Sequence, residues 1–174
     1  MRKVFSALAL FCLAVAGHAQ AMDQEPPKEI KDLSWMVGTW TGTMPMEMEG
    51  QKMDVKSSVV VSMDLKFLKM VTVNDMGFFK LNEVTYVYWD AKAKKYAMNT
   101  FTDMADTPRY EDGDLKDGAL VTVSKPWDVP GMPGPTTSRS TIKKVSDTEI
   151  TVTLEFKQDD KWVQVMKGNM KKKG

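Results

Sequence analysis

The strongest constraint on the fold of this chain is an alternation of apolar and polar side chains over residues 53–65. Asp54, Lys56 and Asp64 lie on one set of alternate positions. The other set is mostly apolar and comprises Met53, Val55, Ser57, Val59, Val61, Met63 and Leu65. A period of two residues is that of a β-strand with one face buried and the other solvated. The sequence therefore predicts a half-buried strand here.

Similar segments recur along the chain. Further strands are predicted over residues 39–48, 67–73, 78–89, 96–102, 106–112, 119–125, 136–145, 148–157 and 161–171. Turn-type residues separate them, and Asp117-Gly118 is a typical hairpin signal. Residues 29–36 place Ile30, Leu33 and Met36 at helical spacing and predict one short helix. About ten short strands joined by hairpins favour an all-β fold, an up-and-down antiparallel barrel with a short N-terminal helix.

The pattern Gly38-x-Trp40-x-Gly42 opens the first predicted strand. Glycines on either side of Trp40 let a neighbouring backbone or a plugging helix approach closely, as at a barrel corner. We expect Trp40 to fill one end of the barrel with a large apolar body. The alternative is an exposed turn that happens to hold two glycines and a tryptophan.

These residues carry a family resemblance. The Gly38–Gly42 stretch, the hairpin around Tyr88-Trp89-Asp90, Gly113 with Gly118, and the strand of Arg139 together resemble a bacterial family of secreted, lipocalin-like proteins of unknown function, within the calycins. The resemblance implies a barrel fold and no established activity. Nitrobindin-type haem barrels share a similar GxWxG start, but their haem depends on a histidine ligand. His18, the one histidine of this chain, lies in the expected signal peptide.

The N-terminus predicts export. Arg2 and Lys3 precede an apolar run over residues 4–16, and Ala19-Gln20-Ala21 is a cleavage signal. We expect residues 1–21 to be a signal peptide, residues 22–29 a flexible lead-in and residues 30–174 the barrel domain, in a periplasmic or secreted protein. The apolar run is too short for an ordinary membrane-spanning helix, so no membrane span is expected after cleavage. An uncleaved anchor is the alternative.

Charge excludes several partners. Without Arg2 and Lys3, 22 basic residues face 23 acidic ones, which gives no electrostatic case for nucleic acid or acidic membranes. An outer-membrane barrel is also disfavoured, because such barrels need apolar outer faces. Here the predicted outer faces carry charges such as Asp54, Lys56 and Glu155. The sequence makes no prediction of the oligomeric state.

The mature chain lacks the residues of most catalytic sites. Cys12 and His18, the single cysteine and histidine, both leave with the signal peptide. This excludes Ser-His-Asp and Cys-His nucleophiles, histidine-ligated haem and ordinary zinc sites. The pairs Asp112/Asp114 and Asp159/Asp160 lie in turn-like contexts typical of solvated carboxylates. We therefore expect a protein that is not an enzyme, with no cofactor, no catalytic residues and no metal site in the favoured hypothesis.

The favoured hypothesis is binding of a small apolar or amphiphilic ligand inside the barrel. Arg139, one of two mature arginines, lies among small polar residues. In the inward orientation it would hold a ligand carboxylate, pair with a structural carboxylate such as Glu83, or lie against the face of an aromatic ring. A surface arginine is the alternative. The candidate lining is Trp40, Met44, Met46, Val59, Val61, Tyr86 and Arg139.

Two other functions remain open. Met44, Met46 and Met48 alternate on one strand and Met53 begins the next, and thioethers can bind Cu(I) in an exported protein. Three such residues on one strand face span ~13 Å, so one ion needs Met53 or a distant methionine as well. The other function is that of a filled barrel acting on a protein partner. The proline-rich loop over residues 126–135, with Trp127, is either a lid or a segment packed on the barrel rim.

Overall fold

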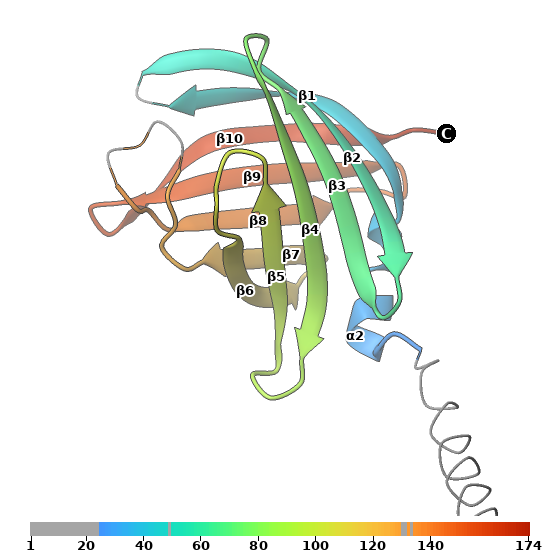
Figure 1. Cartoon of the computed structure of the whole chain (residues 1–174). Helices are drawn as coiled ribbons and strands as arrows, with labels where there is room; N and C mark the ends of the chain where they lie inside the picture. The colour runs from blue at the N-terminus through green and yellow to red at the C-terminus, as the bar shows by residue number, and fades with distance from the viewer. Residues whose placement is uncertain (1–24, 49, 130–131, 133) are drawn as a thin grey trace, which may run out of the picture.

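The described part of the chain forms a closed barrel of ten antiparallel strands preceded by one short helix (Figure 1). The computed structural model describes residues 25–48, 50–129, 132 and 134–174. The predicted signal peptide, including Cys12 and His18, lies outside these residues, and so does the side chain of Met48. The predicted fold class, an all-β up-and-down barrel with a short N-terminal helix, is confirmed.

The elements follow one another with short connections. The helical part is α2 (Lys28–Lys31) followed by the 3-10 turn η2 (Ser34–Met36), in place of one continuous helix over residues 29–36. The strands are β1 (Gly38–Met48), β2 (Gln51–Asp64), β3 (Phe67–Asp75), β4 (Lys80–Asp90), β5 (Lys95–Thr102), β6 (Arg109–Lys116), β7 (Ala119–Ser124), β8 (Ser138–Lys144), β9 (Glu149–Gln158) and β10 (Lys161–Lys172). Each strand pairs with the next along the chain, and β1 pairs with β10 to close the barrel.

Nine of the ten strands lie close to their predicted positions, and β6 is the exception. The sequence predicts residues 106–112, whereas β6 runs over Arg109–Lys116 and continues through Gly113. Gly113 lies where β6 and β7 approach very closely: a Cβ atom there would lie 1.9 Å from the carbonyl oxygen of Val121. The glycine therefore permits close strand packing instead of ending the strand.

The N-terminal helical segment covers one end of the barrel, which we call the proximal end (Figure 1). Trp40 is 1% exposed, and its indole Nε1 donates to the carbonyl oxygen of Met36 at 2.7 Å. Tyr96 on β5 donates its hydroxyl to the carbonyl oxygen of Glu29 at 3.0 Å. Residues 28–36 therefore form a plug held by two side-chain hydrogen bonds, and Trp40 packs under it as the sequence predicts.

The glycine at position 42 serves the closing seam between β1 and β10. A Cβ atom at Gly42 would lie 2.5 Å from the carbonyl oxygen of Asn169 on β10. The predicted close approach of a neighbouring backbone is confirmed, and the neighbour is the last strand of the chain.

The core fills the proximal half of the barrel. Ile30, Leu33 and Met36 of the plug pack with inward residues such as Leu68 and Val87.

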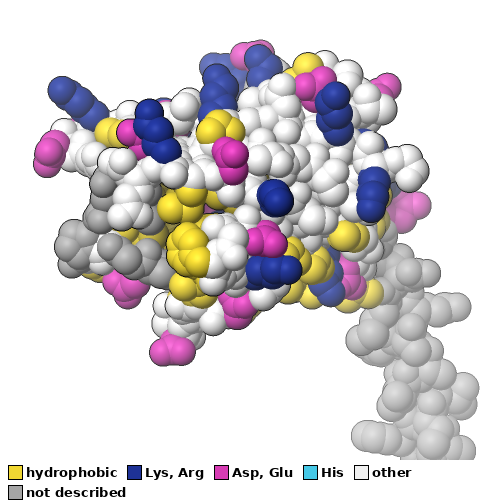
Figure 2. Space-filling view, turned by 90° about the horizontal axis from the view of Figure 1, so that it is seen from above, with side chains coloured by type: hydrophobic (Ala, Val, Ile, Leu, Met, Phe, Trp, Pro, Cys, Tyr) yellow, Lys and Arg dark blue, Asp and Glu magenta, His cyan; other side chains and the backbone are white. Residues whose placement is uncertain are grey.

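On the upper surface, positive and negative side chains are interspersed, with hydrophobic ones between them (Figure 2). Among the described residues, no helix is long and apolar enough to cross a membrane.

Candidate functional site

Five of the seven predicted lining residues face the barrel interior. Trp40 lies opposite Val59, and Val61 lies further along the same face of β2. Met44 and Met46 follow Trp40 at alternate positions of β1. All five side chains are buried. The structure therefore brings Trp40, Met44, Met46, Val59 and Val61 together on the wall formed by β1 and β2.

Arg139 lies on the outside of the barrel, so the inward orientation predicted for it is wrong. Its neighbour Ser138 is fully buried, and alternation turns Arg139 outward beside its cross-strand partner Glu155. The guanidinium donates from Nε and Nη2 to both carboxylate oxygens of Glu155, at 2.6 and 2.7 Å. Its other face lies 4.6 Å from the ring centre of Trp162.

Tyr86 also faces outward, and its predicted place in the interior lining is wrong. The inward positions of this part of β4 are Thr85 and Val87, which are buried. Tyr86 lies opposite Lys69 of β3 on the outer face, and its hydroxyl donates to Asp64 at 3.5 Å. Since residues 84–88 read Val-Thr-Tyr-Val-Tyr, apolar or aromatic side chains fall on both faces, and alternation alone could not orient the strand.

The inward arginine is Arg109, which the sequence analysis did not assign to the site. It lies opposite Thr100, which is buried at 1% exposure. Its Nε lies 2.7 Å from Oε1 of Glu111, and its Nη1 lies 3.6 Å from Oε1 of Glu83. Its side chain is 17% exposed, against 31% for Arg139. One partly buried guanidinium thus lies between two inward carboxylates.

Polar neighbours complete the network. Thr122 donates its hydroxyl to Oε2 of Glu111 at 2.5 Å. Asn74 donates to Oε2 of Glu83 at 3.3 Å. We call Asn74, Glu83, Arg109, Glu111 and Thr122 the distal cluster, because the cluster lies toward the end of the barrel opposite the plug. Among the described residues, every buried side-chain nitrogen and oxygen has a hydrogen-bond partner.

The charges of the distal cluster do not balance. Two carboxylates face one guanidinium, and burial raises the pKa of Glu83 above its ordinary value. Arg109 opposes this rise in the pKa, while the negative charges of Glu111 and Asp103 add to it. A carboxyl group in a low-dielectric site near other carboxylates holds its proton to higher pH. The interior of this end therefore carries an acidic character when Glu83 is ionised.

Trp127 covers the distal cluster. Its ring centre lies 4.8 Å from the guanidinium carbon of Arg109, and its indole Nε1 donates to the hydroxyl of Ser138 at 3.2 Å. Its backbone forms an isolated bridge with Thr136, which holds the two ends of the proline-rich loop together. The sequence left two hypotheses for this loop, a lid or a segment packed on the barrel rim. The structure shows Trp127 packed on the barrel end.

Apolar side chains line the opposite wall of the distal half. Met46 of β1 lies opposite Met53 of β2 and Met166 of β10, so three methionines form one cross-strand row, which we call the methionine row. Val55, Phe156 and Val165 are buried beside it but are not part of the continuous proximal core. The distal interior is thus amphipathic, with charged groups on β4 and β6 and apolar groups on β1, β2, β9 and β10.

The comparisons with known proteins concern the family and the fold. A family described as "Protein of unknown function (DUF1579)" matches residues 25–172. No curated protein matches the chain. The crystal structure of Rv2717c from M. tuberculosis is similar, with a TM-score of 0.62 and 10% sequence identity over 86% of this chain and 100% of that one. At this identity the likeness shows the fold alone, and the calycin and nitrobindin-like placement stays a prediction.

Proposed function

The chain belongs to the DUF1579 family, whose function is unknown, and from its own residues we propose that it binds a small amphiphilic molecule, without catalysis, in the distal half of the barrel. The observation that carries this proposal is the distal cluster, in which one partly buried guanidinium lies between two inward carboxylates. A barrel that needed only a packed core would favour apolar residues there, because burying charges costs free energy.

The two walls of the distal half support an amphiphile. Ligand sites in proteins are mostly apolar, with a few polar groups that orient the ligand. The methionine row and Phe156 supply a flexible apolar wall, since methionine adapts to irregular guests. Glu83, Arg109 and Glu111 supply the orienting groups.

The charge of the cluster favours a ligand with a cationic or hydrogen-donating head group. Arg109 already contacts Glu111 at 2.7 Å, whereas Glu83 has a longer ion pair and one long hydrogen bond. Glu83 is therefore the carboxylate of the cluster that can accept a hydrogen bond from the head group of the ligand. Arg139, which the sequence analysis assigned to a ligand carboxylate, contacts Glu155 on the outer face and cannot play that part.

A pair of matched probes tests this proposal. We would titrate the protein with a dansyl-labelled alkylamine and with the fatty acid of the same length and label. The amine probe should bind with the larger affinity. Glu83→Gln should weaken the binding of the amine probe by about tenfold, since a hydrogen bond to a charged group contributes about 1.5–3 kcal/mol. The matched control is Glu47→Gln, which removes an exposed carboxylate on β1.

Three results would overturn it. Tighter binding of the fatty acid than of the amine would contradict the head-group assignment. Equal weakening by both glutamate variants would show a nonspecific charge effect. Uptake of neither probe would favour the two other hypotheses, Cu(I) binding or a filled barrel that acts on a protein partner.

A second candidate function is the binding of Cu(I), and the methionine row is the observation that favours it. Directly opposite residues on neighbouring strands have Cβ atoms about 5 Å apart, so Met46 can share an ion with Met53 and Met166. Thioether sulfur is a soft ligand that selects Cu(I). The strand register places Met166 opposite Met46, so the third thioether comes from Met166 and not from Met44 or Met48, which the sequence suggested.

An anaerobic competition titration with bicinchoninate would test the copper site. The triple variant of Met46, Met53 and Met166 to leucine should lose Cu(I) binding and keep the fold, because the two residue types are close in volume. Leucine at the exposed Met63 and Met104 is the matched control and should leave binding unchanged. Retention of Cu(I) by the triple variant would contradict this candidate.

A further inference from the structure

A hollow of about 500 Å³ lies on the outer face of the barrel, away from the distal cluster. It is lined by Asp64, Leu65, Phe67, Tyr86, Tyr88, Asn99 and Phe101. The register places the side chains from β3, β4 and β5 on the outer face, since the alternate positions Leu68, Val87 and Thr100 are buried inside. Small-ligand sites have volumes of about 300–1,000 Å³, and this hollow lies in that range.

Aromatic rings form much of its surface. The ring of Phe67 stands edge-on to Tyr86 and to Tyr88, with ring centres 6.4 Å apart in both pairs and interplanar angles of 87° and 89°. Phe67 thereby holds two tyrosines that lie two residues apart on β4. Phe101 on β5 is 50% exposed and adds a further ring. These rings offer flat apolar surfaces, with tyrosine hydroxyls at their tips.

The polar groups of the hollow supply donors and acceptors, and Lys69 beside it offsets the charge of Asp64. Asp64 accepts from the Tyr86 hydroxyl at 3.5 Å and lies 3.9 Å from the ammonium of Lys69. That ammonium also lies 5.7 Å from the Tyr86 ring centre. Asn99 adds an amide, which both donates and accepts. A free cation is disfavoured here, because Lys69 already offsets Asp64 and lies over the ring.

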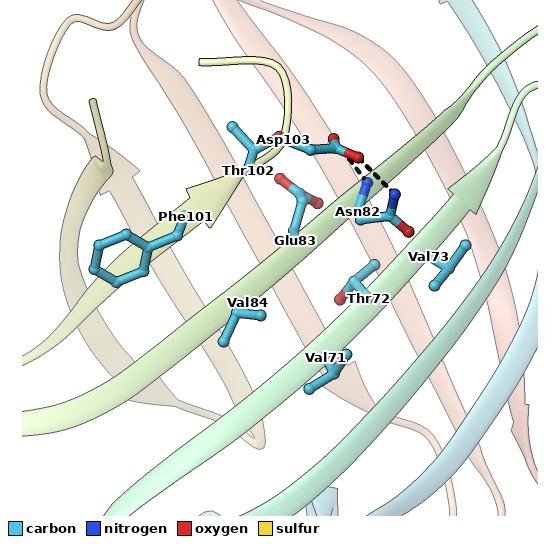
Figure 3. A pocket seen from close by; sticks show the side chains of 9 residues that line it. All are labelled: Val71, Thr72, Val73, Asn82, Glu83, Val84, Phe101, Thr102 and Asp103. Carbon is cyan, nitrogen blue, oxygen red and sulfur yellow. Dashed lines mark hydrogen bonds between the residues drawn. The ribbon is translucent and has the colours of Figure 1, made fainter. Parts of the chain in front are cut away.

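A second hollow of about 260 Å³ extends the first, and the two share Phe101. Val71 and Val84 contribute apolar side chains to it, and Asn82 donates to Asp103 at 2.5 Å at one edge (Figure 3). Apolar surface bordered by amide and carboxylate groups thus continues along β3–β5. The strip has room for a ligand made of several linked units.

We propose that this strip on β3–β5 binds a neutral oligosaccharide. A sugar ring has an apolar C–H face that stacks on aromatic rings and a rim of hydroxyls that both donate and accept hydrogen bonds. Phe101 and the tyrosines suit the face, and Asp64, Lys69 and Asn99 suit the hydroxyls. The site lies on the outer face of the barrel, apart from the interior site proposed above, and Glu83, which also lines the second hollow, is the residue that the two have in common.

The test is a titration of the protein with cellotetraose, maltotetraose and tetra-N-acetylchitotetraose, followed by NMR. At least one should shift the backbone amide of Tyr86 saturably, and Phe101→Ala and Asn99→Ala should each weaken that binding by about tenfold. The matched control is Phe78→Ala, which removes a 75% exposed phenylalanine outside both hollows. Each variant should keep the unfolding midpoint of the parent protein, because the replaced side chains are not in the core.

Choline chloride and a proline-rich peptide serve as competing probes. Binding of either one in place of all three sugars would overturn the proposal in favour of a cation or peptide site. The absence of a shift with any of the three sugars at about 10 mM would also overturn the proposal. Equal loss of binding in Phe78→Ala would place the sugar elsewhere on the surface and would contradict the assignment.

Discussion

The two arginines of the described chain show how one position in a strand decides the role of a side chain. Arg109 lies inside between two carboxylates, and Arg139 lies outside against one carboxylate and one indole ring. Both have a glutamate partner across or along the strand. Their surroundings differ in exposure, and this difference has measurable consequences.

Replacing each arginine with methionine should give unequal losses of stability. Arg109→Met leaves Glu83 and Glu111 buried without their cation, so the free energy of unfolding should fall by about 3 kcal/mol or more. Arg139→Met removes a partly solvated pair and should cost about 1 kcal/mol or less. Urea unfolding of the two variants measures the difference. Equal losses would contradict the inward placement of Arg109.

The raised pKa of Glu83 predicts a dependence of stability on pH. Burial is the main cause of the rise, with Glu111 and Asp103 adding to it and Arg109 opposing it. The folded state therefore keeps the proton to higher pH than the unfolded state, so stability is lost as the pH rises through the folded-state pKa. Glu83→Gln should remove this loss. Unfolding at a series of pH values measures it, and parallel profiles for the parent and variant would contradict the prediction.

At the scale of elements, the plug and the strands under it form one unit. The first strand begins directly after η2, and Trp40 reaches back to the carbonyl of Met36. The hydroxyl of Tyr96 reaches Glu29 in α2. An isolated helix of four residues is not stable in water, so the helical segment depends on these contacts.

Trp40→Ala should lower the free energy of unfolding by about 3–5 kcal/mol, because a large buried aromatic leaves a cavity. Trp162→Ala on the outer face is the matched control and should cost about 1 kcal/mol. Thermal and urea unfolding measure both variants. A loss below about 1 kcal/mol for Trp40→Ala would mean that the plug does not pack on the barrel as described.

Tyr96→Phe should loosen the plug while the barrel stays folded. One hydrogen bond is lost, at a cost of about 1 kcal/mol, and amide exchange in residues 28–36 should become faster. Burial, followed by the charges of Asp32 and Glu29, raises the pKa of Tyr96 to about 12 from 10.0. Stability from this group is present below pH 10 and is lost as the pH rises to about 12. The phenylalanine variant should lack this alkaline loss, and an unchanged loss would assign it to another group.

At the scale of the whole molecule, the barrel has no open sheet edge, because β1 pairs with β10. Closure separates an inner surface, where the distal cluster and methionine row lie, from an outer one, where the aromatic hollow lies. Two binding surfaces of different chemistry can therefore exist in one small domain. The tests above address them separately, since the outer site is tested at Phe101 and Asn99 and the inner one at Glu83 and the methionine row.

Export remains a prediction from the sequence, since residues 1–24 lie outside the described part of the chain. The positive start, apolar run and Ala19-Gln20-Ala21 signal predict cleavage after Ala21. N-terminal sequencing of protein recovered from the exporting cell should therefore begin at Met22. A recovered chain that retains Cys12 would contradict cleavage and favour an anchor.

The sequence by itself determined the positions of every strand but β6, the barrel class and the burial of Trp40. The strand over residues 53–65 has one apolar face, so only one orientation of the strand buries that face. The pairing of β2 with β1 then turns Met44 and Met46 inward as well.

The tertiary structure alone decided the orientation of strands whose two faces look alike. Residues 136–141 are small and polar on both faces apart from Arg139, and Arg109 stands beside a proline and a tyrosine with no periodic pattern before it. Local chemistry favours neither face of such a strand. A shift of one residue in the register exchanges the two faces, so pairing with β7 and β9 turns Arg139 outward, and pairing with β5 turns Arg109 inward.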